Sequence, residues 1–210
     1  MITGHTHVAP GAAVWPLVLM WFSMMATMMV PAAWPWVRAY HRLSAGGPGS
    51  DARGTARFAS GYLLAWLGYA IGAALLQRAL QGMALMATSG DVVVPWLGAV
   101  IFLVAGVYQF APLKRACLTH CRTPLGYFLT RWRDGPAGAF RMGLHHGLFC
   151  VGCCWALMGT AFAVGVMNAR WMVALGVVAL LEQIAPHGQI LRRGLGLVFL
   201  VAGIAGLGFW

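Results

Sequence analysis

Charged side chains are scarce in this sequence: Asp, Glu, Lys and Arg make up 9% of its 210 residues, whereas 60% are hydrophobic. Soluble domains carry about a quarter charged residues, so the composition excludes an ordinary soluble globular protein. A spanning helix needs about 20 apolar residues, and the length therefore allows roughly six spans. We expect an all-α, polytopic transmembrane bundle in which residues 1–210 form a single integral membrane domain.

Basic residues are also missing from the first ten positions, which contain neither Lys nor Arg. A secretory signal peptide begins with a positively charged segment, and its apolar region is shorter than the stretch that follows here. We therefore expect residues 14–37 to remain in the protein as its first span.

Six apolar stretches are present, at residues 14–37, 58–80, 92–112, 142–166, 171–185 and 195–210. The last two are short and would cross a bilayer only with little tilt or with local thinning. Most basic residues follow the first, third and fifth stretches: Arg38, Arg42, Arg53, Arg57, Lys114, Arg115, Arg122, Arg131, Arg133, Arg141, Arg192 and Arg193. The positive-inside rule predicts that these connections are cytoplasmic and that both termini lie outside.

The formal net charge of +10 would suggest nucleic acid binding in a soluble protein. Here the basic residues lie in short connections between apolar stretches, where they set orientation and meet anionic lipid headgroups. Membrane lipids are therefore the expected partners, and nucleic acid is not.

The first apolar stretch is rich in methionine, with Met20, Met24, Met25, Met28 and Met29. At helical spacing these side chains form two adjacent rows on one broad face. Thioethers are soft, neutral ligands that suit Cu(I) rather than Mg²⁺ or Ca²⁺. The alternative is that methionine fills an irregular apolar core.

The fourth apolar stretch carries soft ligands at every fourth position: His146, Cys150, Cys154 and Met158, with Cys153 beside the same stripe. A free cysteine can be a small buried hydrophobe, but three within five residues favour a metal site. Thiolates and thioethers prefer Cu(I), whereas Zn²⁺ usually completes a tetrahedron.

Two further groups of residues are candidates. Cys117, His120 and Cys121 follow the third stretch and would form a compact cytoplasmic site if this segment is helical, or reduced structural thiols in a basic loop. Glu182 is the only acid inside an apolar stretch. A carboxylate there suggests a functional role, or a partner for Arg192 or Arg193.

These motifs resemble a family of bacterial integral membrane proteins predicted to bind metal, one of which delivers copper to a tyrosinase. The resemblance lies in the methionine-rich first stretch, the segment containing Cys117 and Cys121, and the cysteine-rich fourth stretch, and it extends into the fifth. It implies a copper chaperone in the bacterial inner membrane that serves a copper enzyme. The positions that match the family's motifs are Met24, Met25, Met28, Met29, Cys117, Cys121, Cys150, Cys153, Cys154 and Glu182.

Three functions remain open from the sequence. The leading hypothesis is a non-enzymatic Cu(I) carrier whose first and fourth spans converge on a site near the middle of the membrane. A thiol–disulfide oxidoreductase that uses Cys150 and Cys153 is the alternative from the enzyme class. A copper permease would use the same ligands, and homo-oligomerisation stays open.

Overall fold

The computed structural model describes residues 13–44, 52–87, 90, 92–185 and 188–208. Within these ranges the chain is helical and has no strand, only an isolated bridge between Met86 and Val92. This confirms the predicted all-α class. The helices are α1 (Trp15–Ser44), α2 (Ala52–Gly82), α3 (Pro95–Phe110), α4 (Pro112–Cys121), α5 (Pro124–Arg131), α6 (Gly135–Gly159), α7 (Ala161–Val164), α8 (Ala169–Ile184) and α9 (Gly188–Gly208).

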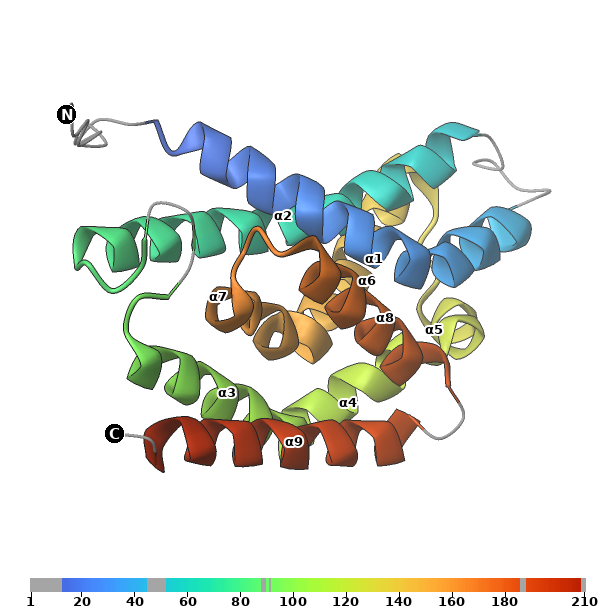
Figure 1. The fold of residues 1–210 in the computed structure, drawn as a ribbon. Helices are drawn as coiled ribbons and strands as arrows, with labels where there is room; N and C mark the ends of the chain where they lie inside the picture. Colours follow the sequence, from blue (N-terminus) through green and yellow to red (C-terminus); the bar gives the residue numbers. More distant parts are fainter. Residues whose placement is uncertain (1–12, 45–51, 88–89, 91, 186–187, 209–210) are drawn as a thin grey trace.

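The cysteine-rich helix α6 occupies the centre of the fold. It packs against α2, α3, α4, α7 and α8, while α1 packs on α2 and α8. Figure 1 shows α1 and α2 crossing on one side of α6 and α8, with α3 and α9 side by side on the other. The buried face of α6, which carries its three cysteines, is therefore enclosed by helices from both halves of the sequence.

Four helices of the described chain are long and apolar enough to cross a membrane: α1, α2, α6 together with α7, and α9. A fifth candidate is the pair α3 and α4, which is bent by 67°. The remaining predicted span corresponds to α8, whose 16 residues extend only about 24 Å at the helical rise. Six spans and two outside termini stay predictions, and residues 1–12 and 209–210 lie outside the described ranges.

Small residues set the contact between α2 and α6. A Cβ on Gly143 would overlap the carbonyl oxygen of Phe58, and one on Gly147 would lie 2.8 Å from the Cβ of Ala65. Glycines four residues apart on α6 therefore allow the close packing of α2. Gly68 and Gly72 have the same spacing on α2, but an added Cβ at either would meet nothing within 4 Å.

The bend between α3 and α4 follows from Pro112. Proline has no amide hydrogen and clashes with the preceding turn, so α3 ends before it and Ala111 is extended, with ψ of 138°. The break leaves carbonyls of α3 without helical partners. Arg192 of α9 donates a hydrogen bond to one of them, the Gln109 carbonyl. The bend turns α4 onto α6 and α8.

Candidate metal centre

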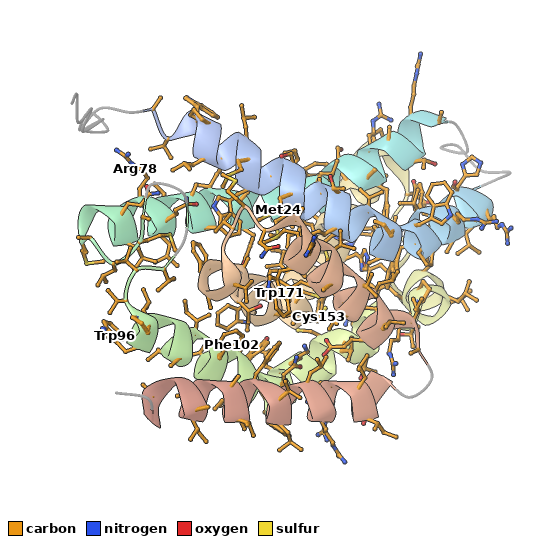
Figure 2. All side chains as sticks on the ribbon, viewed as in Figure 1. Met24, Arg78, Trp96, Phe102, Cys153 and Trp171 are labelled. Carbon is orange, nitrogen blue, oxygen red and sulfur yellow. The ribbon has the colours of Figure 1, made fainter. Side chains whose placement is uncertain are left out.

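Three buried thiols from two helices form a compact group. Cys150 and Cys153 lie on α6, one turn apart, and Cys121 is the last residue of α4. Their three Sγ atoms lie within 4.8 Å of one another, and Cys121 and Cys153 are separated by 4.0 Å. Each side chain is at most 6% exposed. Figure 2 places Cys153 in the middle of the helices.

This spacing fits one metal ion with three sulfur ligands. A metal–thiolate bond of about 2.3 Å puts the three sulfurs of a planar trigonal site about 4.0 Å apart. Cys154 adds a fourth buried thiol, 3.1 Å from Cys153, but it does not belong to the close group of three. Three soft sulfurs in an apolar surrounding are the ligands that favour Cu(I).

Two polar side chains contact the thiols from neighbouring helices. The Gln183 amide of α8 donates weak hydrogen bonds to the sulfurs of Cys150, Cys153 and Cys154, at 3.7, 3.8 and 3.5 Å. The Tyr62 hydroxyl of α2 lies 3.4 Å from the sulfur of Cys150. The amide donor of Gln183 stabilises a thiolate and orients it toward a metal.

The backbone around the thiols is also held by side chains. The indole nitrogen of Trp36 on α1 donates to the Cys121 carbonyl at 2.9 Å. The Tyr108 hydroxyl of α3 donates to the Gly152 carbonyl. Because helix ends leave carbonyls without partners, the indole hydrogen bond fixes the position at which α4 ends and presents its thiol.

The expected local site in the segment containing Cys117, His120 and Cys121 is divided by the structure. The segment is helical, as that expectation required, but Cys121 points to the thiols of α6. Cys117 is buried against Gly152, where an added Cβ would lie 3.0 Å from its sulfur. The His120 ring stacks on Phe149 with centroids 4.1 Å apart. Neither Cys117 nor His120 belongs to the close group.

The other ligands predicted on α6 are buried beside the thiols. The His146 ring stacks on Trp36 with centroids 3.8 Å apart, and neither ring nitrogen has a hydrogen-bond partner. Met158 is fully buried in the same core cluster as the thiols. Neither residue is part of the close sulfur group.

The methionines of α1 divide between the buried core and a cavity beside α8. Met25 and Met29 are fully buried in the core cluster that contains the thiols, and the Tyr62 hydroxyl links the Met29 carbonyl to the sulfur of Cys150. The others line a cavity of about 580 Å³ between α1 and α8. Its methionines are Met20, Met24, Met28, Met167 and Met172.

Glu182 forms a buried ion pair with Lys114 of α4 rather than with Arg192 or Arg193. The Nζ and Oε2 atoms are 2.7 Å apart, and both side chains are 1% exposed. The expectation that Lys114 lies in an exposed connecting loop is wrong, because α4 begins at Pro112 and turns Lys114 into the protein. The pair ties α4 to α8, the helices that supply Cys121 and Gln183.

Sequence reasoning missed Tyr62, Lys114 and Gln183. Gln183 carried a usable signal, because it follows Glu182 in an apolar stretch and polar groups in such stretches are rarely idle. Tyr62 carried none, since tyrosine is common in apolar helices. Lys114 resembled the other basic residues of its segment.

The helices and thiols together define a class: an all-α protein whose membrane-length apolar helices enclose a cysteine cluster that could hold a metal ion. Within this class, the family model of the PpoB2 copper chaperone matches residues 18–206. The chain therefore belongs to the PpoB2 copper chaperone family, which confirms the resemblance to copper chaperones. No curated protein and no solved structure is significantly similar to the chain.

Proposed function

We propose that this protein is a membrane carrier that binds Cu(I) at Cys121, Cys150 and Cys153 and passes it to a copper-dependent enzyme. The observation that carries the proposal is the group of three buried thiols within 4.8 Å of one another. One thiolate neutralises the charge of the ion, which would otherwise be costly in hydrocarbon. Family membership supports copper as the metal, and the all-sulfur ligand set favours its +1 state.

The proposed location is the bacterial inner membrane, with both termini outside. The basic connections support this orientation. A six-span arrangement requires α8 to cross as well, and local thinning of the bilayer would let its 16 residues do so.

The methionines of α1 provide a route away from the thiols. Met25 and Met29 share the core cluster with Cys150, while Met24 and Met28 line the cavity beside α8 with Met167. Thioethers bind Cu(I) as neutral ligands, and copper can move between them by ligand exchange. Release from the stronger thiolate ligands requires a recipient that binds copper more tightly still.

Two matched cysteine variants test the proposal. Cys121→Ser removes a thiol from the close group, whereas Cys117→Ser removes a buried thiol one turn earlier on the same helix. Purified protein in detergent is loaded anaerobically with Cu(I), Zn²⁺ or Fe²⁺, and the metal content and Cu(I) affinity are measured.

We expect C121S to lower the Cu(I) affinity more than about 100-fold, because even residues that only orient metal ligands are worth 10- to 100-fold. The C117S variant should keep the affinity of the original protein. Equal affinities for C121S and C117S would refute this site, and preferential loading with Zn²⁺ or Fe²⁺ would refute copper as its metal.

A further inference from the structure

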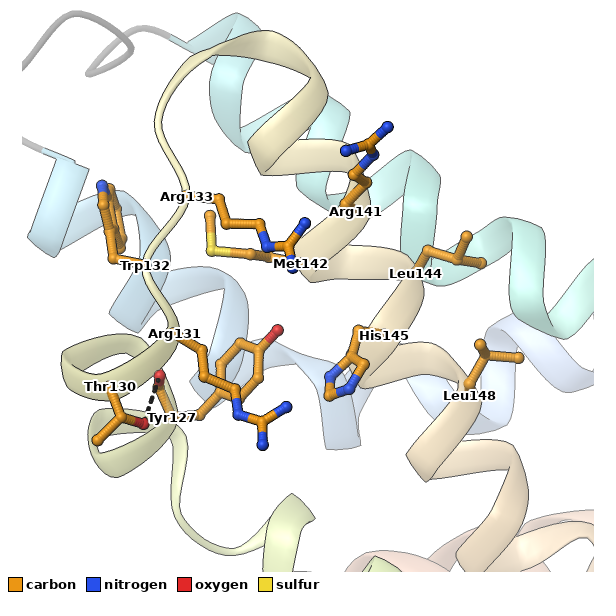
Figure 3. A pocket seen from close by; sticks show the side chains of 10 residues that line it. All are labelled: Tyr127, Thr130, Arg131, Trp132, Arg133, Arg141, Met142, Leu144, His145 and Leu148. Carbon is orange, nitrogen blue, oxygen red and sulfur yellow. Dashed lines mark hydrogen bonds between the residues drawn. The ribbon is translucent and has the colours of Figure 1, made fainter.

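A second cavity, of about 570 Å³, lies where α5 and the loop after it meet the first half of α6. The ionisable residues that line it are Tyr127, Arg131, Arg133, Arg141 and His145. Figure 3 shows Arg131 and His145 extending into the same space from α5 and α6, with Tyr127 beside them. Burial raises the pKa of Tyr127, and the nearby charges of Arg131 and Arg133 act against that shift.

The guanidinium groups of this cavity have no carboxylate partner among the described residues. The chain has only four acidic residues. Of these, Glu182 pairs with Lys114, and Asp134 accepts a hydrogen bond from the Trp132 indole at 2.8 Å. In the described part of the chain, no ion pair other than that of Lys114 and Glu182 is present. Three positive charges around one cavity therefore favour an anion from outside the chain.

One lining residue of the cavity, His145, lies near the residues that carry the thiols. His145 Nδ1 and His120 Nε2 are buried without hydrogen-bond partners, and the two ring centroids are 5.5 Å apart. His120 precedes Cys121, whose sulfur belongs to the close group. His146, with two unpartnered nitrogens, lies 6.2 Å from His120 between ring centroids and one turn before Cys150. Imidazole nitrogen is also a copper ligand.

We propose, on the basis of the proposed function, that this cavity receives the anionic complex in which Cu(I) arrives, namely Cu(I) bound to a small thiol that carries carboxylate groups. Guanidinium groups bind carboxylates through paired, charge-assisted hydrogen bonds. Arg131, Arg133 and Arg141 hold the carboxylates, and His145 and His120 face the metal.

The transfer is a ligand exchange without a change in oxidation state. The copper–sulfur bond to the donor breaks as the imidazoles of His145 and His120 bind copper. A copper–sulfur bond to Cys121 then forms as the copper–nitrogen bonds break. The proton of the Cys121 thiol passes to the departing donor thiolate, so that the donor leaves as a neutral thiol with its carboxylates.

The test compares two donors that differ only in their carboxylates. The full-length protein is placed in nanodiscs of phosphatidylcholine and loaded with Cu(I) from its complex with glutathione or with glutathione diethyl ester. The triple variant R131Q/R133Q/R141Q removes the charges of the cavity. The control R42Q/R53Q/R57Q removes three exposed arginines that do not line it.

We expect the cavity variant to load roughly tenfold more slowly from the glutathione complex, since it loses charge-assisted hydrogen bonds. Loading from the diethyl ester complex should be unchanged, and the control variant should load as the original protein does. The final copper content of every variant should be equal, because the thiols are intact. If no variant binds copper from either donor, and the original protein does not, the proposed function itself fails.

Three results would overturn the docking proposal alone. Equal slowing by the cavity and control variants would indicate general attraction by net charge. Equal slowing with both donors would indicate damage to the route rather than loss of carboxylate binding. If added phosphatidylglycerol abolishes the difference between the original protein and the cavity variant, the cavity binds lipid phosphate instead.

Discussion

The buried ion pair between Lys114 and Glu182 offers a direct test of how α4 is held. Lys114→Met keeps an unbranched side chain of similar volume but leaves the Glu182 carboxylate without its partner at a position that is 1% exposed. Removing one partner of a buried pair typically costs about 3 to 5 kcal/mol. The double variant K114M/E182M should recover most of this loss, because two apolar side chains of similar volume replace the pair and its desolvation cost.

The measurement is the free energy of unfolding in mixed micelles with increasing SDS, followed by circular dichroism. Arg115→Met is the matched control, since Arg115 is exposed on the same helix and a surface change of this kind is usually worth no more than about 0.5 kcal/mol. A loss below about 1 kcal/mol for K114M would contradict the reasoning. So would a double variant that is as unstable as the single one.

Two further predictions concern the backbone. Gly143→Ala should destabilise the protein by about 1 to 3 kcal/mol, because its Cβ would overlap the Phe58 carbonyl. Gly68→Ala, with open space around it, should be neutral. Equal shifts of the melting temperature for the two variants would argue against close packing of α2 and α6. Pro112→Ala should straighten the break before α4 and lower Cu(I) affinity about 10- to 100-fold by displacing Cys121. Adding C121S to this variant should then cost less than C121S does alone, and fully additive losses would show that the bend does not position the thiol.

Much of the fold could be predicted from the sequence because an apolar environment restricts the choice of structure. Backbone groups in hydrocarbon must be satisfied within the segment, so long apolar stretches become helices. Residues 14–37, 58–80, 142–166 and 195–210 each fall largely within a helix of spanning length. The bend at Pro112 was missed as a feature of the fold, although proline is a reason to end a helix.

The candidate site was predictable where its ligands share one helix. Cys150 and Cys153 were identified from local spacing alone, because helical periodicity fixes which side chains share a face. The third thiol of the group, that of Cys121, was not identified as their partner, since nothing in the sequence near it indicates whether it turns toward Cys117 or toward α6.

The sequence alone therefore determined the helical class, the soft character of the ligands and the stripe on α6, which depend on composition and on contacts between near neighbours. Only the tertiary structure decided that Cys121 completes the group of three thiols and that Lys114 is buried against Glu182. It also decided that the methionines of α1 divide between the buried core and the cavity beside α8. These facts depend on how far α4 turns after Pro112 and on how closely the glycines of α6 let α2 approach. Both are properties of packing between segments distant in the chain, and no local pattern encodes them.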